Sequence, residues 1–428
     1  MPSRKILMVT GFFPPYSPLG AVRAPALVAH WQEQGHDLRV LAMENPAIRG
    51  MLDAPLPPEK IIYAPLGVAS RQPVAHGAAG QNGRTSAANS PAEPSGLISI
   101  LRRFYWYAAQ FPDRYRGWID QAVAAGRTMA TAWRPELIYS SAPPHSGHVV
   151  ACRLSRQLGI PWIAELRDTW AGNPYTDAPW LMRLIRDRYA NAVLRHARAC
   201  VTLTRTAQAE VEAAVHRPTI VSYNGFSPED FSDLESVPAW DTERLDIIHA
   251  GIIYAGRRDP TALFQALALM GAERRYVRVR FFHDELDAVT RSAEQLGVHD
   301  SVEICRPVPR REILRIQRGA DVLLLCRWAD PADDGIIPGK LFEYIGARRP
   351  ILAVGSTTGE ASEIVRTGPF GRVSNTPVEI ADQLRAWIRE KRAAGGRLPD
   401  LPSAPTEAYL RDTQFARIDE LLRQRVAA

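Results

Sequence analysis

The sequence predicts an α/β protein with two domains, each built on a doubly wound parallel sheet. Short runs rich in β-branched residues alternate with longer stretches of helical period, and this alternation stops near residue 226 and restarts near residue 245. The length of 428 residues fits two large domains or three of ordinary size. A hydrophobic content of 46% and a charged content of 23% exclude a wholly disordered, collagen-like or disulfide-scaffold chain.

The first series opens with a clear strand-loop-helix unit. Lys5–Thr10 reads as a buried strand, Gly11–Gly20 as a loop rich in proline and glycine, and Ala21–Gly35 as a helix that tolerates Pro25 in its first turn. The same alternation then predicts strands at Asp37–Met43, Glu136–Ser140, Pro161–Leu166, Ala199–Thr204 and Thr219–Tyr223, and helices at Ser146–Leu158, Trp180–His196 and Thr206–Val215.

The second series repeats this alternation. It predicts strands at Leu245–Ile252, Tyr276–Phe282, Val302–Arg306, Asp321–Cys326 and Pro350–Val354, and helices at Pro260–Met270, Glu285–Leu296, Arg310–Gly319, Gly339–Arg348 and Gly359–Thr367. Between the two series, a stretch with Pro228, Pro238, several acidic residues and no periodicity indicates a linker.

These patterns give the domain boundaries. We expect an N-terminal domain over 1–225, a linker over 226–241, a C-terminal domain over 242–405 and a terminal helical segment over 406–428. Two similar halves imply a cleft between them. Open parallel sheets bind ligands outside the carboxyl ends of their strands, so two facing sheets would place two ligands across one crevice.

Two segments of the N-terminal domain do not fit the alternation. Residues 67–96 are rich in Gly, Ala, Ser, Asn and Pro and are expected to form a mobile loop. The next stretch, Leu97–Tyr107, can form a helix with an apolar face, two arginines on the other side and interfacial aromatics. Such a helix suits a membrane surface, and it suits packing on the N-terminal domain equally well.

Composition and motifs exclude several classes of function. Cys152, Cys200, Cys305 and Cys326 are widely spaced, which favours neither a zinc site nor a disulfide framework. No apolar run is long enough to cross a bilayer, and Ile6–Thr10 is interrupted too early for a signal peptide, so we expect a cytoplasmic protein. The net charge of +6 fits phosphate-bearing ligands or an anionic membrane, and no nucleic-acid-binding signature accompanies it. Signatures of hydrolases, P-loop proteins and dinucleotide enzymes are absent from the sequence.

The most informative stretch runs from Asp333 to Tyr344. A strand leads into a loop with glycines and a proline, and then into a helix that begins near Gly339, which presents free backbone N–H groups to an anion. Lys340 adds a formal positive charge, and Glu343 can accept hydrogen bonds from vicinal hydroxyls such as those of a ribose. The alternative is a helix with a surface lysine and a salt-bridged glutamate.

The loop from Gly251 to Pro260, at the start of the C-terminal domain, also leads from a strand into a helix and could also bind an anion. Its glycines permit close approach of the backbone to a ligand, and Arg257 and Arg258 precede a helix. Such a clamp would hold a diphosphate leaving group on which charge develops. Adjacent arginines are also common on protein surfaces.

In the N-terminal domain, histidines and charged residues follow two neighbouring strands. His145 is expected on a loop at the cleft and His148 in the following helix, where they could bind sugar hydroxyls or position an acceptor, or where His145 could merely begin the helix. Arg167 and Asp168 end the next strand at the same edge, either as functional groups or as a structural pair. No acidic cluster has the spacing of a Mg²⁺ site, so no metal is expected.

Six motifs then stand in a familiar order. They are Gly-Phe-Phe-Pro-Pro-Tyr followed by Gly20, Ser-Ala-Pro-Pro-His-Ser-Gly-His, Ala-Glu-Leu-Arg-Asp-Thr-Trp, Tyr-Asn-Gly-Phe, His-Ala-Gly-Ile-Ile-Tyr and Pro-Gly-Lys-Leu-Phe-Glu-Tyr-Ile. Together they resemble family 4 glycosyltransferases of the GT-B fold, especially the bacterial branch that acts in surface-polysaccharide assembly. The resemblance implies a retaining, metal-independent transfer from a nucleotide-diphosphate sugar, with the acceptor on the N-terminal domain and the donor on the C-terminal one.

The resemblance also implies roles for single residues. Glu343 matches the second glutamate of the family's E-x7-E motif, which holds the ribose, and Gly335 stands where the first would be. Asp333, Asp334 or the N–H groups of the Gly335–Ile337 loop would then replace that carboxylate. The diphosphate pair resembles Arg257 or Arg258 with Lys340, and the last helical stretch would cross back to the N-terminal domain. The implied donor contacts are completed by Ile336, Ile337, Pro338, Gly339, Gly251, Tyr254 and Leu341, and the acceptor side by Gly20, His148, Arg167 and Asp168, with His145 among the catalytic residues.

Two other functions stay open at this point. A GT-B sugar-nucleotide epimerase would use a free sugar nucleotide and would have little use for the Leu97–Tyr107 helix. A catalytically degenerate GT-B binding subunit would be consistent with the missing first glutamate at Gly335.

Overall fold

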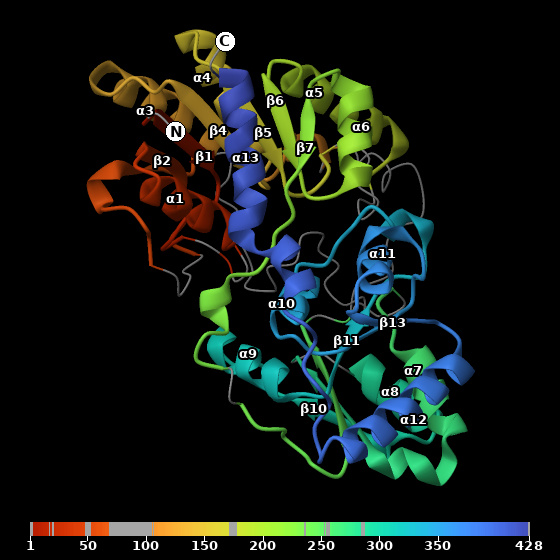
Figure 1. Cartoon of the computed structure of the whole chain (residues 1–428). Coiled ribbons are helices and arrows are strands. Elements are labelled where there is room, and N and C mark those ends of the chain that lie inside the picture. The colour runs from red at the N-terminus through yellow and green to blue at the C-terminus, as the bar shows by residue number, and fades with distance from the viewer. Residues whose placement is uncertain are drawn as a thin grey trace. The chain divides into compact units, whose positions relative to one another are not determined.

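The computed structural model describes residues 3–16, 18, 21–47, 53–67, 105, 107–170, 178–234, 237–251, 253, 257–283 and 287–426. The chain divides into two compact units, Met1–Ser222 with Phe415–Ala428 and Tyr223–Gln414. Each unit contains one parallel sheet with helices on both faces, which confirms the predicted fold class. Figure 1 shows the elements of both units.

The N-terminal unit is built on a seven-stranded sheet of order β3-β2-β1-β4-β5-β6-β7. The strands are β1 (Lys5–Thr10), β2 (Asp37–Glu44), β3 (Ile61–Pro65), β4 (Leu137–Ala142), β5 (Trp162–Leu166), β6 (Ala199–Thr202) and β7 (Thr219–Val221). The helices are α1 (Arg23–Glu33), α3 (Trp118–Ala132), α4 (Ser146–Leu158), α5 (Trp180–Leu194), α6 (Arg205–Val215) and most of α13 (Arg411–Val426). Strand β3 and helix α3 were not predicted from the sequence.

Alternate residues of β1 enter two different cores. Leu7 and Val9 pack with residues of α3, α4, α5 and α6, whereas Ile6 and Met8 pack with residues of α1 and α13. This alternation is the two-residue period of a strand that is buried on both faces. The C-terminal helix is therefore a structural part of the first sheet's core.

The C-terminal unit is built on a six-stranded sheet of order β10-β9-β8-β11-β12-β13. The strands are β8 (Leu245–Ala250), β9 (Val277–Phe282), β10 (Val302–Cys305), β11 (Val322–Cys326), β12 (Ile351–Val354) and β13 (Gly371–Val373). The helices are α7 (Thr261–Leu269), α8 (Asp287–Gln295), α9 (Arg310–Gly319), α10 (Lys340–Gly346), α11 (Gly359–Thr367) and α12 (Pro377–Ala393). β13 and α12 extend the unit beyond the last element that the sequence predicted.

The stretch predicted as a linker is packed into the C-terminal unit. Phe226, Phe231, Leu234 and Val237 are buried in the core that also contains residues of α9, α10 and α11. A side chain at Gly346 would collide with Phe226 and Phe231, because a Cβ there would lie 2.6–2.7 Å from their rings. The apolar spacing of this stretch has no helix or strand period, and for that reason the sequence pattern did not reveal its burial.

Two predictions lie outside the described residues. The mobile insert over 67–96 is described only at Gly67, and the Leu97–Tyr107 helix only at Tyr105 and Tyr107. Across the described ranges, no helix is both long and apolar enough to cross a membrane.

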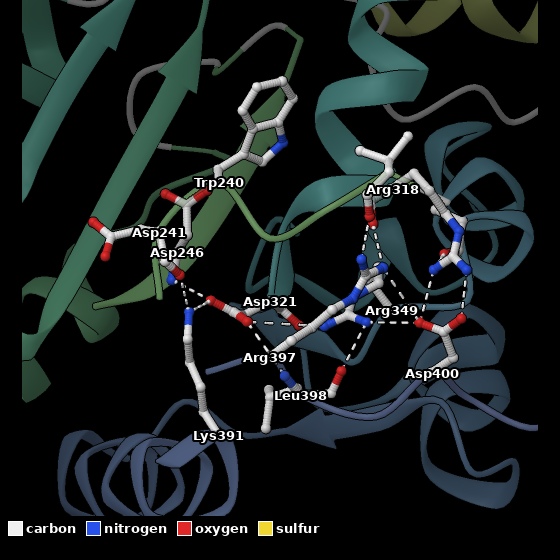
Figure 2. A network of polar contacts seen from close by, with 12 residues as sticks. Trp240, Asp241, Asp246, Arg318, Asp321, Arg349, Lys391, Arg397, Leu398 and Asp400 are labelled. Atoms are coloured by element: carbon white, nitrogen blue, oxygen red, sulfur yellow. Dashed lines mark hydrogen bonds and ion pairs between the residues drawn. The ribbon is translucent and has the colours of Figure 1, made fainter. Parts of the chain in front are cut away.

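A buried network of charges joins the amino ends of several strands in the C-terminal unit (Figure 2). Lys391 of α12 and Asp321, which precedes β11, form an ion pair, and the side chains of both are only 1% exposed. The Lys391 ammonium also donates to the carbonyl oxygens of Asp241 and Arg244. All three of its donors are therefore used, as a buried ammonium requires.

The Asp321 carboxylate and its neighbours are equally well saturated. Asp321 accepts a 2.9 Å hydrogen bond from the N–H of Asp246 in β8, and Arg349 lies 3.9 Å from its other oxygen. Arg349 continues the network to Asp400, which also pairs with Arg318 of α9. These cations hold the pKa of Asp400 at about 2 despite its partial burial.

We predict that Lys391→Met destabilises the C-terminal unit by about 3–5 kcal/mol, because it leaves Asp321 buried without its main counter-charge. Chemical unfolding followed by hydrogen exchange at β8 and β11 measures this loss. The double variant Lys391→Met/Asp321→Asn should recover part of it, since no lone buried charge remains.

The matched control for this prediction is Arg385→Ala on the same helix. Arg385 forms an exposed ion pair with Glu273, and its loss should cost less than about 1 kcal/mol. Equal effects of the two single variants would contradict the assignment of Lys391 as a structural anchor.

Candidate functional site

The central feature of the C-terminal unit's site is a lysine held against a histidine. His249 lies near the carboxyl end of β8, and Lys340 is the first residue of α10. Nδ1 of His249 lies 2.9 Å from the carbonyl oxygen of Leu324, and Nε2 lies 3.3 Å from Nζ of Lys340. Because a carbonyl oxygen only accepts, His249 carries its proton on Nδ1, and Nε2 accepts from the ammonium.

Burial changes the charge state of both groups. It lowers the pKa of His249 far below 6.5, and the nearby Lys340 lowers it further, so His249 is neutral. Burial, followed by the repulsion of Arg258, lowers the pKa of Lys340 to about 8. An anion bound beside Lys340 would favour the charged form and would be attracted most strongly where little water screens the ammonium.

Gly251 and Arg258 lie close to Lys340, whereas Arg257 contacts a tryptophan. Gly251 has a φ of +111°, which favours glycine, and a Cβ at this position would lie 3.0 Å from Nζ of Lys340 and would crowd the ammonium. Arg258 is close enough to act electrostatically on Lys340 and His249. The Arg257 guanidinium stacks over the ring of Trp328, 4.7 Å from its centre. The structure thus brings Lys340, Gly251 and Arg258 together and places Arg257 against Trp328.

Glu343 lies in the same helix as Lys340 and forms an ion pair with Arg310, a partner that the sequence did not identify. Its Oε1 accepts from Arg310 at 2.5 Å, and Arg310 also contacts Asp230 at 2.9 Å. The structure therefore shows the salt-bridged glutamate that the sequence left open as the alternative. A hydroxyl ligand would have to share the carboxylate with Arg310.

The two aspartates suggested as substitutes for a glutamate at position 335 are occupied elsewhere. Asp333 is buried against Arg327 at 3.2 Å, and Asp334 accepts from Thr358 and Ser356. Both carboxylates therefore stabilise the loop, and their suggested role in replacing the missing group stays a prediction.

Backbone donors of this loop remain for a ligand. Within the described part of the chain, the N–H groups of Gly335 and Ile337 donate to no acceptor, whereas the N–H of Ile336 donates to Asp333. The Leu341 side chain is fully buried in the core, and its N–H donates to the carbonyl oxygen of Pro338. Pro338 is also buried. Leu341 therefore packs in the core. Gly339 is exposed before α10, and Tyr254 lies outside the described residues.

In the N-terminal unit, the carboxyl ends of β4 and β5 gather two histidines and a tryptophan. The His145 ring stacks on Trp170 with 5.1 Å between ring centres and an angle of 5°, and His148 lies 5.9 Å from Trp170. Nδ1 of His148 contacts Oγ of Ser140 at 2.8 Å. Burial lowers the pKa of His145 well below 6.5 and that of His148 to about 3, so both rings are neutral.

Several polar atoms of this cluster have no hydrogen-bond partner among the described residues. They are Nδ1 of His145, Nε2 of His148, Nε of Arg167 and Nε1 of Trp170. Buried polar atoms normally find a partner, so their gathering at one sheet edge indicates a site for a polar ligand or ordered water. Arg167 also donates to the Pro143 carbonyl at 2.7 Å, Asp168 is exposed, and Gly20 lies outside the described residues.

A second buried cluster at this edge is structural. Glu165 pairs with Arg23 of α1 at 2.9 Å and accepts from Tyr139 and Ser141, while Arg23 also donates to Ser222. Arg23 holds the pKa of Glu165 below its ordinary value despite complete burial. Sequence patterns did not predict this pair, because its members are 142 positions apart.

Within the ranges that the structure describes, no group of three or more His, Cys, Asp or Glu side chains could hold a metal ion.

Comparison with known proteins gives one family and several structures. Residues 20–225, just under half of the chain, match the glycosyl transferase 4-like domain. Curated protein sequences give no match. HepE of Anabaena, in a complex with UDP and glucose, shares 16% identity and a TM-score of 0.63 over 98% of this chain and 100% of that one.

Two further structures show the same architecture. Sucrose-phosphate synthase from Thermosynechococcus elongatus has 13% identity and a TM-score of 0.60 over 99% of each chain. The lipopolysaccharide outer core galactosyltransferase WaaB, in its apo form, has 12% identity and a TM-score of 0.59 over 98% of this chain and 99% of that one. The two sheets thus have the GT-B fold, and residues 20–225 in the N-terminal part of the chain match a glycosyl transferase 4-like domain.

We predict that the ammonium of Lys340 titrates near pH 8 and that His249→Phe lowers its pKa, because the phenyl ring cannot accept the hydrogen bond that favours the charged form. Lysine-selective ¹⁵N NMR measures this, since the chain has only four lysines. In His249→Gln the pKa of Lys340 should lie above its value in His249→Phe, because the amide oxygen of glutamine can accept from the ammonium.

The Lys340 signal is assigned by its loss in Lys340→Arg. A Lys340 signal that titrates near 10.5 in the wild type, or one that His249→Phe leaves unchanged, would contradict the arrangement.

Proposed function

We propose that this glycosyltransferase moves a sugar, with retention of configuration, from a UDP-sugar to a glycan or lipid-linked acceptor in bacterial surface-polysaccharide assembly. The observation that carries the proposal is the Lys340 ammonium, held by neutral His249 beside Gly251 and near Arg258. A diphosphate is the anion that such a group of cations fits, because negative charge grows on it as the glycosidic bond breaks.

The donor would be held by groups on three segments of the C-terminal unit. Lys340 and Arg258 neutralise the diphosphate, with Arg257 at its edge, and Gly251 lets the phosphates approach the backbone. The N–H groups of Gly335 and Ile337 donate to phosphate or sugar oxygens in place of the missing carboxylate. Glu343, oriented by Arg310, accepts from the ribose hydroxyls.

UDP is proposed as the carrier because HepE, a structural neighbour over the whole chain, was solved with UDP and glucose. The bacterial surface-polysaccharide role follows the order of motifs in the sequence and the likeness to WaaB. Retention of configuration rests on the family resemblance. Sugar-nucleotide epimerisation is the weaker candidate, since the matched domain is that of glycosyl transfer.

The acceptor side would use the histidine cluster of the N-terminal unit. Neutral His145 and His148, together with Trp170 and Arg167, offer unpartnered nitrogen atoms that hydroxyl groups can satisfy. His145 would orient a hydroxyl of donor or acceptor, and exposed Asp168 and Gly20 would complete this side. The enzyme would work in the cytoplasm, peripherally at the inner face of the membrane when the acceptor is lipid-linked.

Lys340→Ala should reduce turnover by about 10²-fold or more, because a preorganised charge is lost from the transition state. UDP release is measured with a panel of UDP-sugars, with and without lipid-extract acceptors. Lys340→Arg is the matched variant that keeps the charge, and it should retain more activity. A folded Lys340→Ala enzyme with an undiminished rate would remove Lys340 from the donor site, and release of free sugar epimer without acceptor would favour the epimerase.

Activity should survive treatment with EDTA, because arginine, lysine and backbone N–H groups supply the positive charge that the diphosphate needs. The same UDP-release assay measures this after dialysis. Loss of activity in EDTA that Mg²⁺ or Mn²⁺ restores would refute metal independence and leave the glycosyltransferase assignment intact.

A further inference from the structure

Helix α5 exposes large apolar side chains on its outer face. Trp180 is 70% exposed, Leu181 39%, Leu184 40% and Ile185 43%. At 100° per residue these four positions fall within an arc of roughly 140°. Met182, Ala190, Val193 and Leu194 form the buried face of the helix, so the exposed residues are a second apolar surface.

Positive charge borders this surface. Arg183 and Arg188 are exposed, and Arg188 follows Leu184 by one turn on the same face. The single acidic residue between Trp180 and Arg188 is Asp187, which pairs with Arg186 at 3.3 Å. The first nine residues of α5 therefore combine an apolar stripe with net positive charge.

This combination fits an anionic bilayer better than a protein. A tryptophan at the start of the stripe, aliphatic side chains beside it and flanking arginines are the features of a helix that lies in a membrane interface. Arginine stems can cover apolar surface while their guanidinium groups contact lipid phosphates. Four side chains on one helix provide less area than the about 800 Å² that each partner buries in a stable protein complex.

Helix α5 also lies near the candidate acceptor residues. Helix α5 is the first described helix after β5, whose carboxyl end is followed by Arg167 and Asp168. Arg186, in the same turns of the helix, is close enough to His145 to repel a proton from it.

We propose that Trp180, Leu181, Leu184 and Ile185 dock the N-terminal unit on an anionic membrane surface, with Arg183 and Arg188 binding lipid phosphates. This inference rests on the proposed function where it concerns a lipid-linked acceptor, and it places the docking helix at α5. Attachment of this kind is reversible, because interfacial burial of a few side chains and two arginines is weakened by salt.

The test is flotation of the full chain with vesicles of phosphatidylcholine alone or with 30% phosphatidylglycerol, at low and high salt. The wild type should bind the anionic vesicles at low salt and not the neutral ones. Trp180→Ser/Leu184→Ser and Arg183→Glu/Arg188→Glu should each lower the partition coefficient more than tenfold. Leu269→Ser is the matched control, since Leu269 is a 56% exposed residue of α7, and it should change nothing.

Other outcomes overturn the proposal. No binding of the wild type to anionic vesicles at low salt, equal binding to both vesicle types, or binding that the α5 variants leave unchanged would each do so. Loss of binding in Arg102→Glu/Arg103→Glu together with full binding of the α5 variants would assign docking to the 97–107 segment. A concentration-dependent dimer that the α5 variants abolish, without vesicle binding, would show a second copy on this surface.

UDP titration by calorimetry separates this inference from the proposed function. The α5 variants should bind UDP as the wild type does, because none of their residues belongs to the donor site. UDP binding without vesicle binding would defeat only the docking proposal, and vesicle binding without UDP binding would defeat only the donor assignment.

Discussion

The buried carboxylate of Asp321 is the constraint around which the C-terminal unit is arranged. It sits at the amino end of β11, where Lys391 of α12, the backbone of β8 and Arg349 before β12 all satisfy it. Removing Lys391 would leave the Asp321 carboxylate without its main counter-charge in a region that water does not reach. The amino ends of the strands are thereby committed to holding the sheet and its helices together, and the carboxyl ends carry the cations and unpartnered donors that can bind a ligand.

The loop before α10 shows how this division extends to the site. Asp333 is held by Arg327, and Asp334 by Thr358 and Ser356, so the acidic residues of the loop fix its path. With those carboxylates engaged, the groups that remain toward a ligand are Lys340 and backbone N–H groups. A loop stabilised in this way presents its backbone N–H groups next to Lys340, which is a suitable preorganisation for an anionic leaving group.

In the N-terminal unit, one buried polar group has all its hydrogen-bond partners, whereas its neighbours at the end of the adjacent strand do not. Glu165 is saturated by Arg23, Tyr139 and Ser141, and this cluster connects α1 to the middle of the sheet. The imidazoles of His145 and His148, at the end of the adjacent strand, keep unpartnered nitrogen atoms. Since buried polar atoms are costly without a partner, these histidines are the ones suited to a ligand.

The sequence by itself determined the two parallel sheets, most of their elements and the stretch that contains Lys340, because residue periodicity and glycine-rich loops are local signals. Only the tertiary structure decided which partners those residues have. His249 meets Lys340 across 91 positions, and Arg310 meets Glu343 across 33. The structure also showed that Phe226 and Phe231, which the sequence predicted as linker, are buried. It added four elements that the sequence did not predict, β3, α3, β13 and α12. A periodic local pattern indicates which face of a helix or strand is buried, whereas the burial of an aperiodic segment, like hydrogen bonds and ion pairs, depends on which distant segments the fold brings beside it.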